Sequence, residues 1–380
     1  MVILMQQTKI VNKKIQFFFF SIIVFLPIVV FAVCYFGYVA YRTADIYRIV
    51  KTNQRGWKGI VHTADPEVGF RPVPNAVGAH VFPIGPDVPM RYDADGFRVP
   101  LDIETAEKTK RPIILSLGCS FTYGDATYAE ETYPYLVGQS LQGTSRNAGV
   151  CSYGLSQMLL LARKLVPIHK PDILLVQYSP WLVQRAIKPF APVYYGKLPT
   201  PFFYDQDQGF ALRPPVFTTK IMGLPVDSFR KSSSGLADWI SFYRKVGLPL
   251  YLYDDFNMLK YYIYKNIGKV PEPTGSRKQL VKYVYNEIYK VAQQYDTKVV
   301  IVVLGKDAHP VEVKDLSFPA GALLVNAQDA LLKRLPVVNP ESYEKEYAHW
   351  RGSPPRVVDD HPNEKAHKII ADTIVSKLTE

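Results

Sequence analysis

The longest apolar stretch of the chain lies close to its first residue. No charged side chain occurs from Ile15 to Tyr41, and Phe, Ile and Val dominate these 27 positions. A helix needs about 20 such residues to cross a bilayer. The pattern therefore predicts a transmembrane anchor over 15–41, preceded by a short tail over 1–14. A cleaved signal peptide fits less well, because the bulky Tyr38 stands where small residues precede a cut.

The charges on either side of this span bear on its orientation. Three lysines precede it without an acidic neighbour, and three basic residues follow it, namely Lys9, Lys13, Lys14, Arg42, Arg48 and Lys51. Positive charge favours the cytoplasmic side, although the residues after the span weaken the contrast. We expect a single-pass protein with a cytoplasmic N-terminus and its main body outside the cytoplasm, in the periplasm or at the cell surface.

From Arg111 onward, short apolar runs alternate with amphipathic segments. Strands are predicted at 113–117, 146–150, 172–178 and 298–304, with a further strand and helix within 321–335. Helices are predicted from Thr132, around 155–165 with Pro167 as its end, and over 277–295 and 363–378. The strand at 172–178 is apolar throughout, as expected when both sheet faces are covered. The alternation predicts an α/β domain over 111–380, a parallel sheet between two helical layers.

Two segments break this rhythm. Residues 42–110 are rich in proline and glycine and contain short motifs such as Gly69-Phe70-Arg71-Pro72. These motifs predict short strands and turns that pack on the domain. An insertion at about 185–275 carries many prolines and an aromatic tract. It could be a lid over a pocket, a surface lying on the membrane, or ordinary core of an enlarged domain.

Composition narrows the function classes. The net charge of +11 is spread along the chain without a run of five or more Lys and Arg, which argues against nucleic-acid binding. The histidines include no HxH or HxxxH pair, and no CxxC occurs, so neither a metal site nor another cofactor is expected. The basic surface could face anionic lipid or an acidic glycan.

Candidate chemistry lies at the end of the first predicted strand. Ile113–Leu117 is followed by Gly118-Cys119-Ser120, which places a serine at the carboxyl end of a parallel strand, where ligands bind in such sheets. Serine needs a base to become a nucleophile. His361 in Asp359-Asp360-His361-Pro362-Asn363 can supply one, with a carboxylate to orient its ring. A similar motif occurs at Asp307-Ala308-His309-Pro310. Because no comparable helix follows it, we interpret His309 as a loop residue.

Three blocks of the sequence resemble the SGNH (GDSL-type) hydrolases. They are Gly118-Cys119-Ser120-Phe121-Thr122-Tyr123-Gly124, Asn147-Ala148-Gly149-Val150-Cys151-Ser152-Tyr153-Gly154 and Asp359-Asp360-His361-Pro362-Asn363. The resemblance covers about 111–182 and 354–380, and 69–98 is similar to the lead-in of membrane-anchored members. It implies a three-layer α/β/α sandwich and a triad of Ser120, His361 and Asp359, with Asp360 in reserve.

The resemblance also implies an oxyanion hole, and here the chain departs from the family pattern. Ser152 stands at the place of a donor glycine, and Trp181 at the place of an asparagine. Losing one such donor can cost about 3 kcal/mol of transition-state stabilisation. Cys119 and Cys151 follow adjacent predicted strands, so they could form a disulfide or remain small buried thiols.

The resemblance implies an acyl esterase or O-acyltransferase that acts on acetyl or other acyl esters of glycans outside the cytoplasm, or on a lipid ester. The departures leave a second hypothesis open, in which the chain is a catalytically silent binding or scaffold module in envelope polysaccharide assembly.

Overall fold

The computed structural model describes residues 2–52, 54, 56–102, 109–193, 196–207, 209–230, 232 and 234–380. Parts of three predicted regions lie outside the described residues: Met1 of the tail, residues 53, 55 and 103–108 of the lead-in, and residues 194, 195, 208, 231 and 233 of the insertion.

One sheet runs through the described part of the body, with nine strands in the order β1-β4-β5-β6-β8-β7-β9-β14-β15. Its parallel part consists of β8 (Thr144–Asn147), β7 (Ile113–Leu117), β9 (Ile173–Tyr178), β14 (Lys298–Val303) and β15 (Leu323–Asn326). The central strands β7, β9 and β14 are almost entirely buried. Apolar residues on both faces of these strands require cover from both sides.

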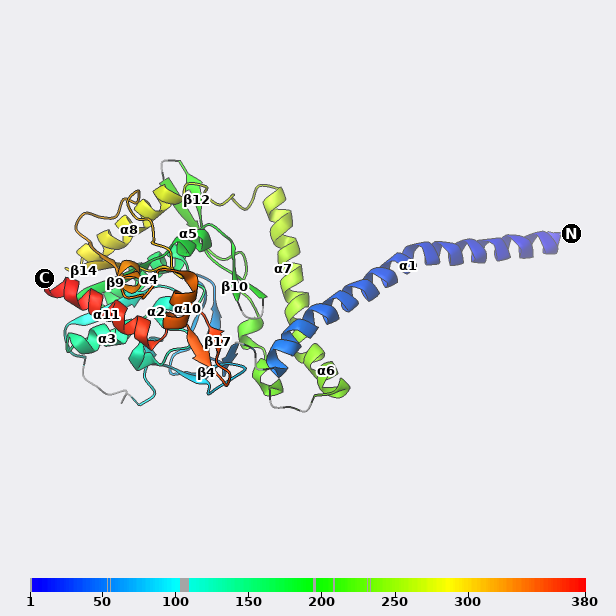
Figure 1. Cartoon of the computed structure of the whole chain (residues 1–380). Helices are drawn as coiled ribbons and strands as arrows, with labels where there is room; N and C mark the ends of the chain where they lie inside the picture. The colour runs from blue at the N-terminus through cyan, green and yellow to red at the C-terminus, as the bar shows by residue number, and fades with distance from the viewer. Residues whose placement is uncertain are drawn as a thin grey trace.

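Two groups of helices supply that cover (Figure 1). One group is α3 (Tyr133–Ser140), α9 (Ala327–Leu332) and α11 (Glu364–Thr379), with α10 (Pro340–Tyr347) against α11; the other is α4 (Leu155–His169), α5 (Pro180–Ala186) and α8 (Arg277–Gln293). A single large core joins both groups to the sheet. The predicted three-layer α/β/α fold with a central parallel sheet is confirmed.

Helix α4 differs from its predicted end. It continues through Pro167 to His169, so the prediction that Pro167 ends it is wrong. Pro167 lies in the last turn, where only two helical residues follow it, so little of the helix depends on the hydrogen bond that it removes. The helix ends instead at Lys170, which adopts a left-handed φ of 42°.

The lead-in extends the same sheet. Its strands are β1 (Gly56–Lys58), β4 (Val77–Val81), β5 (Val88–Tyr92) and β6 (Arg98–Val99), all antiparallel to their neighbours, while β2 (His62–Asp65) and β3 (Gly69–Pro72) form a separate hairpin. Strand β6 pairs with β8 through Arg98 and Asn147. The lead-in thus brings its own side chains to the edge of the parallel strands.

Helix α1 (Val2–Lys51) contains the predicted span. Its part from Ile15 to Lys51 is long and apolar enough to cross a membrane, with a window of mean hydropathy 2.9 that is not buried against the rest of the chain. The helix does not stop near Tyr41, where the lead-in was predicted to begin. It continues to Lys51, and its last turns pack against the insertion.

The insertion forms two hairpins, β10 (Phe190–Val193) with β11 (Gly196–Pro199) and β12 (Phe202–Gln206) with β13 (Gly209–Arg213). Two short 3₁₀ turns follow at Ile221–Gly223 and Val226–Phe229, and then α6 (Leu236–Phe242), a π-helical turn (Tyr243–Gly247) and α7 (Leu248–Asn266). Val39, Ile46 and Val50 of α1 share one buried cluster with Phe242 and Val246 of this segment. This part of the insertion therefore forms core with the end of α1.

Candidate active site

Ser120 begins the short helix α2 (Ser120–Tyr123), directly after β7 and the turn at Gly118 and Cys119. A Cβ at Gly118 would lie 1.9 Å from Thr122 Oγ1 and 2.5 Å from Gln177 Oε1, so the turn requires glycine. The Ser120 side chain is buried, and its hydroxyl donates to the Cys119 sulfur at 3.8 Å. The strand end thus presents a serine, as predicted, with its hydroxyl turned toward its own neighbour.

The Cys119 sulfur accepts two further hydrogen bonds. Gln177 Nε2 lies 3.3 Å away and Trp181 Nε1 3.5 Å away. Burial alone would raise the pKa of Cys119, but the Arg185 charge, the Phe121 backbone N–H and the Trp181 and Gln177 donors together lower it. Cys119 and Cys151 are both free buried thiols, so the disulfide that their positions allowed is not formed.

His361 and Asp359 form a tight pair. The His361 Nδ1 atom lies 2.7 Å from Asp359 Oδ1, which also accepts the His361 backbone N–H at 2.8 Å. Asp359 is 3% exposed, at the end of β17 (Arg356–Asp359). Asp360 Oδ1 lies 3.8 Å from the same ring nitrogen, but its side chain is 79% exposed. The geometry therefore favours Asp359 over Asp360 as the carboxylate that orients the ring.

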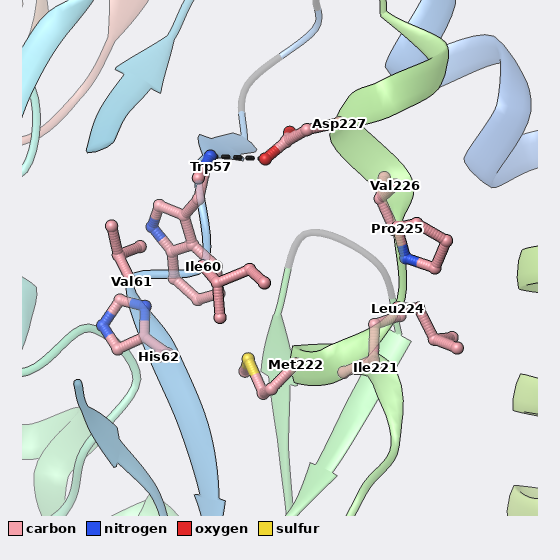
Figure 2. Close-up of a pocket in the computed structure, with 11 residues that line it drawn as sticks. Trp57, Ile60, Val61, His62, Ile221, Met222, Leu224, Pro225, Val226 and Asp227 are labelled. Carbon is pink, nitrogen blue, oxygen red and sulfur yellow. Dashed lines mark hydrogen bonds between the residues drawn. The ribbon is translucent and has the colours of Figure 1, made fainter. Parts of the chain in front are cut away.

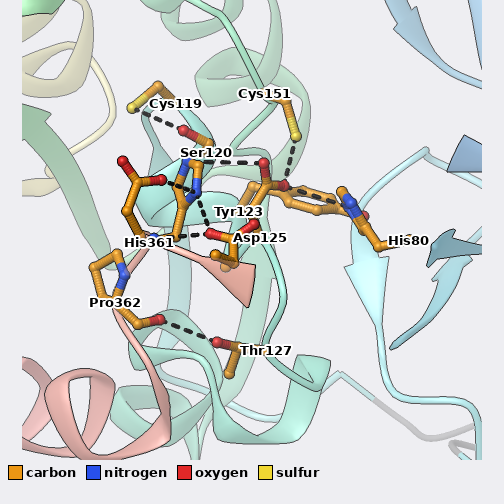
Figure 3. Close-up of polar contacts among 12 residues, drawn as sticks. His80, Cys119, Ser120, Tyr123, Asp125, Thr127, Cys151, His361 and Pro362 are labelled. Atoms are coloured by element: carbon orange, nitrogen blue, oxygen red, sulfur yellow. Dashed lines mark hydrogen bonds and ion pairs between the residues drawn. The ribbon is translucent and has the colours of Figure 1, made fainter. Parts of the chain in front are cut away.

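The ring contacts a second carboxylate that the sequence analysis did not identify. Asp125 Oδ2 lies 3.8 Å from His361 Nε2, and the Asp125 side chain is 2% exposed. Its other oxygen, Oδ1, accepts the Cys151 thiol at 2.7 Å and lies 3.3 Å from His80 Nε2. His361 is thus bracketed by Asp359 at Nδ1 and Asp125 at Nε2 (Figure 3).

Ser120 and His361 share neighbours, although no hydrogen bond joins them in the described structure. The Phe121 ring packs against the His361 ring, with centroids 5.2 Å apart. The Asp125 backbone N–H donates to the Ser120 carbonyl at 3.1 Å. These contacts bring the predicted serine and histidine to one end of the sheet from positions far apart in the sequence.

The loop that carries Asp125 is held by the lead-in. The buried Arg98 guanidinium donates to the carbonyls of Tyr123, Gly124 and Thr127 at 2.5–2.6 Å. The Thr127 hydroxyl donates to the Pro362 carbonyl at 3.1 Å, next to His361. The lead-in therefore fixes the loop between Ser120 and the histidine.

The two predicted oxyanion residues differ in their placement. Ser152 has a φ of 66°, a left-handed conformation that glycine adopts more readily. Trp181 lies in the first turn of α5 and directs its indole N–H at the Cys119 sulfur, with its ring 5.1 Å from that of Phe121. Trp181 thus contacts Cys119 and Phe121, the two chain neighbours of Ser120, but its donor already has an acceptor.

Among the residues that the structure describes, two groups contain side chains that could ligate a metal. The donor atoms of His80, Asp125 and Cys151 lie within 4.8 Å of one another, as do those of Asp359, Asp360 and His361. The first group comes from three separate segments, which no local spacing in the sequence could indicate. Burial and the adjacent Asp125 charge raise the pKa of the Cys151 thiol well above its usual range. The thiol therefore keeps its proton and donates a hydrogen bond to Asp125.

His309 lies in the loop after β14, and its backbone N–H donates to Asp307 Oδ1 at 3.0 Å. Within the part of the chain that the structure describes, no hydrogen bond of this loop reaches Ser120 or His361. This placement agrees with its interpretation as a loop residue.

A separate cavity of about 300 Å³ lies between the lead-in and the insertion (Figure 2). Its lining residues are mostly apolar and come from 57–62 and 221–227: Trp57, Gly59, Ile60, Val61, His62, Ile221, Met222, Leu224, Pro225, Val226 and Asp227. The Asp227 carboxylate accepts the Gly59 backbone N–H. Neither Ser120 nor His361 lines this cavity, so it is distinct from the candidate active site.

Comparisons with known proteins give a limited result. No protein-family model matches the sequence, and no curated protein matches it either. Among solved structures, similarity is found to a catalytic mutant of an acetylxylan esterase from Geobacillus stearothermophilus, with 12% identity, a TM-score of 0.36, and coverage of 72% of this chain and 96% of that one.

Two further solved structures are similar at the same level. An α/β hydrolase from a Lake Arreo metagenome has 11% identity, a TM-score of 0.35, and coverage of 72% and 97%. A lipolytic protein of the G-D-S-L family from Veillonella parvula has 9% identity, a TM-score of 0.31, and coverage of 70% and 98%. At these values the similarities establish neither family membership nor activity. The α/β fold and the site geometry stand on the chain's own residues.

Proposed function

We propose that this chain is a serine esterase or O-acyltransferase of the SGNH type, with Ser120 as nucleophile, His361 as base and Asp359 as the carboxylate that orients the ring. One observation carries the proposal: the buried Asp359 lies 2.7 Å from His361 Nδ1, and that histidine shares Phe121 and Asp125 with Ser120. A carboxylate at Nδ1 fixes the tautomer whose Nε2 can accept a proton.

In the proposed reaction, the Ser120 hydroxyl first turns from the Cys119 sulfur toward His361 Nε2. Its oxygen attacks the ester carbonyl while Nε2 takes its proton, and a tetrahedral oxyanion forms. The C–O bond to the alcohol then breaks, and the imidazolium returns the proton to the leaving oxygen. Water or a sugar hydroxyl, deprotonated by the same nitrogen, attacks the acyl-Ser120 ester and releases the acid or a new ester.

The oxyanion would be stabilised by backbone donors at the start of α2 and by the Ser152 N–H. Trp181 can contribute only if its indole N–H leaves the Cys119 sulfur. Because Ser120 is buried, we infer that the site favours a small acyl group such as acetyl.

The proposed substrate is an acyl ester of a glycan outside the cytoplasm, with a lipid ester as the second candidate. The substrate class follows from the sequence resemblance, and the location follows from a proposed membrane anchor at 15–41 with its N-terminus in the cytoplasm. The long exposed apolar run of α1 supports the anchor. A transferase rather than a hydrolase would differ only in which hydroxyl attacks the acyl-enzyme.

A silent binding module is the second candidate. Two hydrogen bonds favour it: the Ser120 hydroxyl and the Trp181 indole N–H both donate to the Cys119 sulfur. In this arrangement neither group is directed at a substrate. A protein of this kind would retain the fold and bind acylated glycan without cleaving it.

Hydrolysis of p-nitrophenyl acetate by the full chain in detergent separates these candidates. Ser120→Ala should lower kcat/KM by about 1,000-fold or more, because the nucleophile is lost. Ser116→Ala is the matched control, since Ser116 is a buried serine on β7 whose hydroxyl has no partner among the described residues. Equal rates for the wild type and Ser120→Ala would support the silent module.

A further inference from the structure

Helix α7 exposes a row of large apolar side chains. Leu252, Phe256, Leu259 and Ile263 of the helix and Ile267, which directly follows its last residue, are 43%, 68%, 59%, 50% and 57% exposed, respectively. At 3.6 residues per turn, positions 252, 256, 259, 263 and 267 fall within an arc of roughly 80° on one side of the helix. We call these five residues the α7 stripe. A contiguous exposed apolar row of this kind marks an interaction surface.

Part of the remaining surface of α7 packs against the chain, while Tyr262 and Tyr264 outside the stripe are 53% and 39% exposed. Leu250, Tyr251 and Tyr261 are buried. On the edge next to the stripe, Asp255 Oδ1 accepts Arg42 Nη1 of α1 at 2.7 Å, and the Arg42 guanidinium lies 4.0 Å from the centre of the Tyr251 ring. The helical period places the stripe beside this α1-contacting edge and on the side opposite Tyr261. The stripe therefore faces away from the α/β body.

The contacts with α1 show which part of the apolar span lies next to α7. Tyr35 and Arg42, near the end of the uncharged run, both bind the Asp255 carboxylate in the middle of α7. In Figure 1, α7 runs steeply across the direction of the N-terminal half of α1 and lies between that half and the body. A helix in this position meets the surface of a bilayer that α1 crosses.

We propose that α7 lies in the membrane–water interface, with the α7 stripe inserted at the boundary between headgroups and acyl chains. An amphipathic helix binds in this way by burying its apolar face about 5–10 Å below the headgroups. The occupant is a lipid bilayer with anionic headgroups, because Lys260 and Lys269 flank the stripe, both beside the Tyr264 ring. Basic side chains of this kind attract anionic lipid.

This inference rests on the proposed membrane anchor, which it deepens. A span alone fixes only one point of the chain to the membrane. A second helix in the interface, joined to the span by Arg42 and Asp255, would fix the orientation of the body as well. The proposed active site would then act at a defined height above the lipid surface.

Tryptophan quenching in vesicles tests the inference on the full chain. Phe256→Trp places a reporter in the stripe, Tyr253→Trp places one on another side of the same helix, where the ring packs with Phe217, and Phe19→Trp marks the span. Each variant is reconstituted in phosphatidylglycerol–phosphatidylcholine vesicles that contain lipid with a nitroxide near the headgroup or near the chain end. Wild-type chain supplies the background of the four native tryptophans.

The expected result is quenching of Phe256→Trp by the shallow nitroxide about twofold stronger than that of Tyr253→Trp, at the depth expected of an interfacial helix. Phe19→Trp should respond most to the deep nitroxide. If Phe19→Trp is quenched and Phe256→Trp is no more quenched than Tyr253→Trp, the α7 inference is wrong and the anchor stands. If Phe19→Trp is not quenched either, the anchor itself is wrong. Crosslinking between copies through the stripe, without quenching, would show a second copy as its occupant and overturn the proposal.

Discussion

In the α/β body, apolar side chains of α4, α8 and α11 are buried, whereas many large apolar side chains of α1 and α7 are exposed. Both regions use the same apolar residue types, chiefly Leu, Ile, Val and aromatic side chains. The difference lies in the solvent that each face meets: protein in the body, and in our proposal lipid in the unit formed by α1 and α6–α7, which we call the anchor unit. The comparison suggests that chemistry and location belong to separable parts of the chain.

The largest expected effect sharpens the chemical side of this comparison. Asp359→Asn should lower kcat by about 10³–10⁴-fold, because an amide at Nδ1 no longer enforces the tautomer with a free Nε2. Asp360→Asn is the matched neighbour and should change kcat less than about twofold, since that exposed carboxylate is screened by water. Both are measured as ester hydrolysis by the full chain.

Vesicle binding of Asp359→Asn should equal that of the wild type, because the substitution lies in the body. A larger loss for Asp360→Asn than for Asp359→Asn would exchange the roles of the two carboxylates. Loss of vesicle binding in either variant would contradict the separation of body and anchor unit.

The next effect concerns the joint inside the anchor unit. A Cβ at Gly247 would lie 2.1 Å from Thr43 Oγ1 and 2.4 Å from Thr43 Cγ2, so Gly247→Ala forces α1 and the insertion apart. Overpacking of this kind costs about 1–3 kcal/mol. Hydrogen exchange over 236–266 should accelerate, while ester hydrolysis stays at the wild-type rate.

Gly235→Ala serves as the control, because a Cβ there meets nothing within 4 Å. A wild-type exchange rate in Gly247→Ala would mean that the packing of α1 on the insertion is looser than the structure indicates. A fall in hydrolysis would mean that the anchor unit reaches the active site.

Acid should weaken the body through His367. Burial, with smaller contributions from His349, Arg98 and His361, lowers the pKa of His367 to about 3, and its Nδ1 accepts the Tyr133 backbone N–H at 3.2 Å. The unfolded chain takes up this proton below about pH 6.5, so the stabilising contribution is complete above that pH and is lost as the pH falls toward 3. At pH 5 the loss should be about 2 kcal/mol.

The variant His367→Asn keeps an acceptor but cannot become charged. We therefore expect its stability to fall less steeply than that of the wild type between pH 8 and pH 5, in denaturant titrations of both chains. Parallel pH profiles would show that His367 is not buried as a neutral ring.

The anchor unit should respond to pH with the opposite sign. Burial and the adjacent Asp255 charge raise the pKa of Asp254 to about 6. The folded state therefore holds this proton more tightly, and its contribution to stability is present below about pH 4 and lost as the pH rises through 6. Asp254→Asn should stabilise α7 by about 2 kcal/mol at pH 7.5 and by little at pH 4, as measured by hydrogen exchange of 248–266. An equal effect at both values would indicate that Asp254 is already solvated.

Sequence reasoning recovered β7, β9 and β14 because their signal is local, whereas β8 was predicted at 146–150 and lies at Thr144–Asn147. The apolar runs of β7, β9 and β14 and the period of α4 depend on neighbouring residues alone. It failed at Pro167, where the cost of proline depends on its position within the helix. It also failed to join the lead-in to the sheet, because the pairing of Arg98 with Asn147 is a long-range contact.

The site divides in the same way. Three site residues lie in recognisable sequence motifs: Ser120, Asp359 and His361. The structure places Asp359 against the His361 ring, and Phe121, the residue after Ser120, packs on the same ring. No such motif contains Asp125 or His80. Only the fold places Asp125 near His361 Nε2, and His80 near Asp125. The one available sequence signal for Asp125 was a carboxylate five residues after a candidate nucleophile.

The central claim is that His361 activates Ser120, and covalent labelling tests it most directly. The full chain is treated with a fluorophosphonate, and the modified peptide is identified by mass spectrometry in wild type, Ser120→Ala and His361→Ala. The account predicts a single adduct on Ser120 that forms at least about 100-fold more slowly without the His361 base. An adduct on another residue, no adduct in the wild type, or labelling of Ser120 at an unchanged rate in His361→Ala would contradict it.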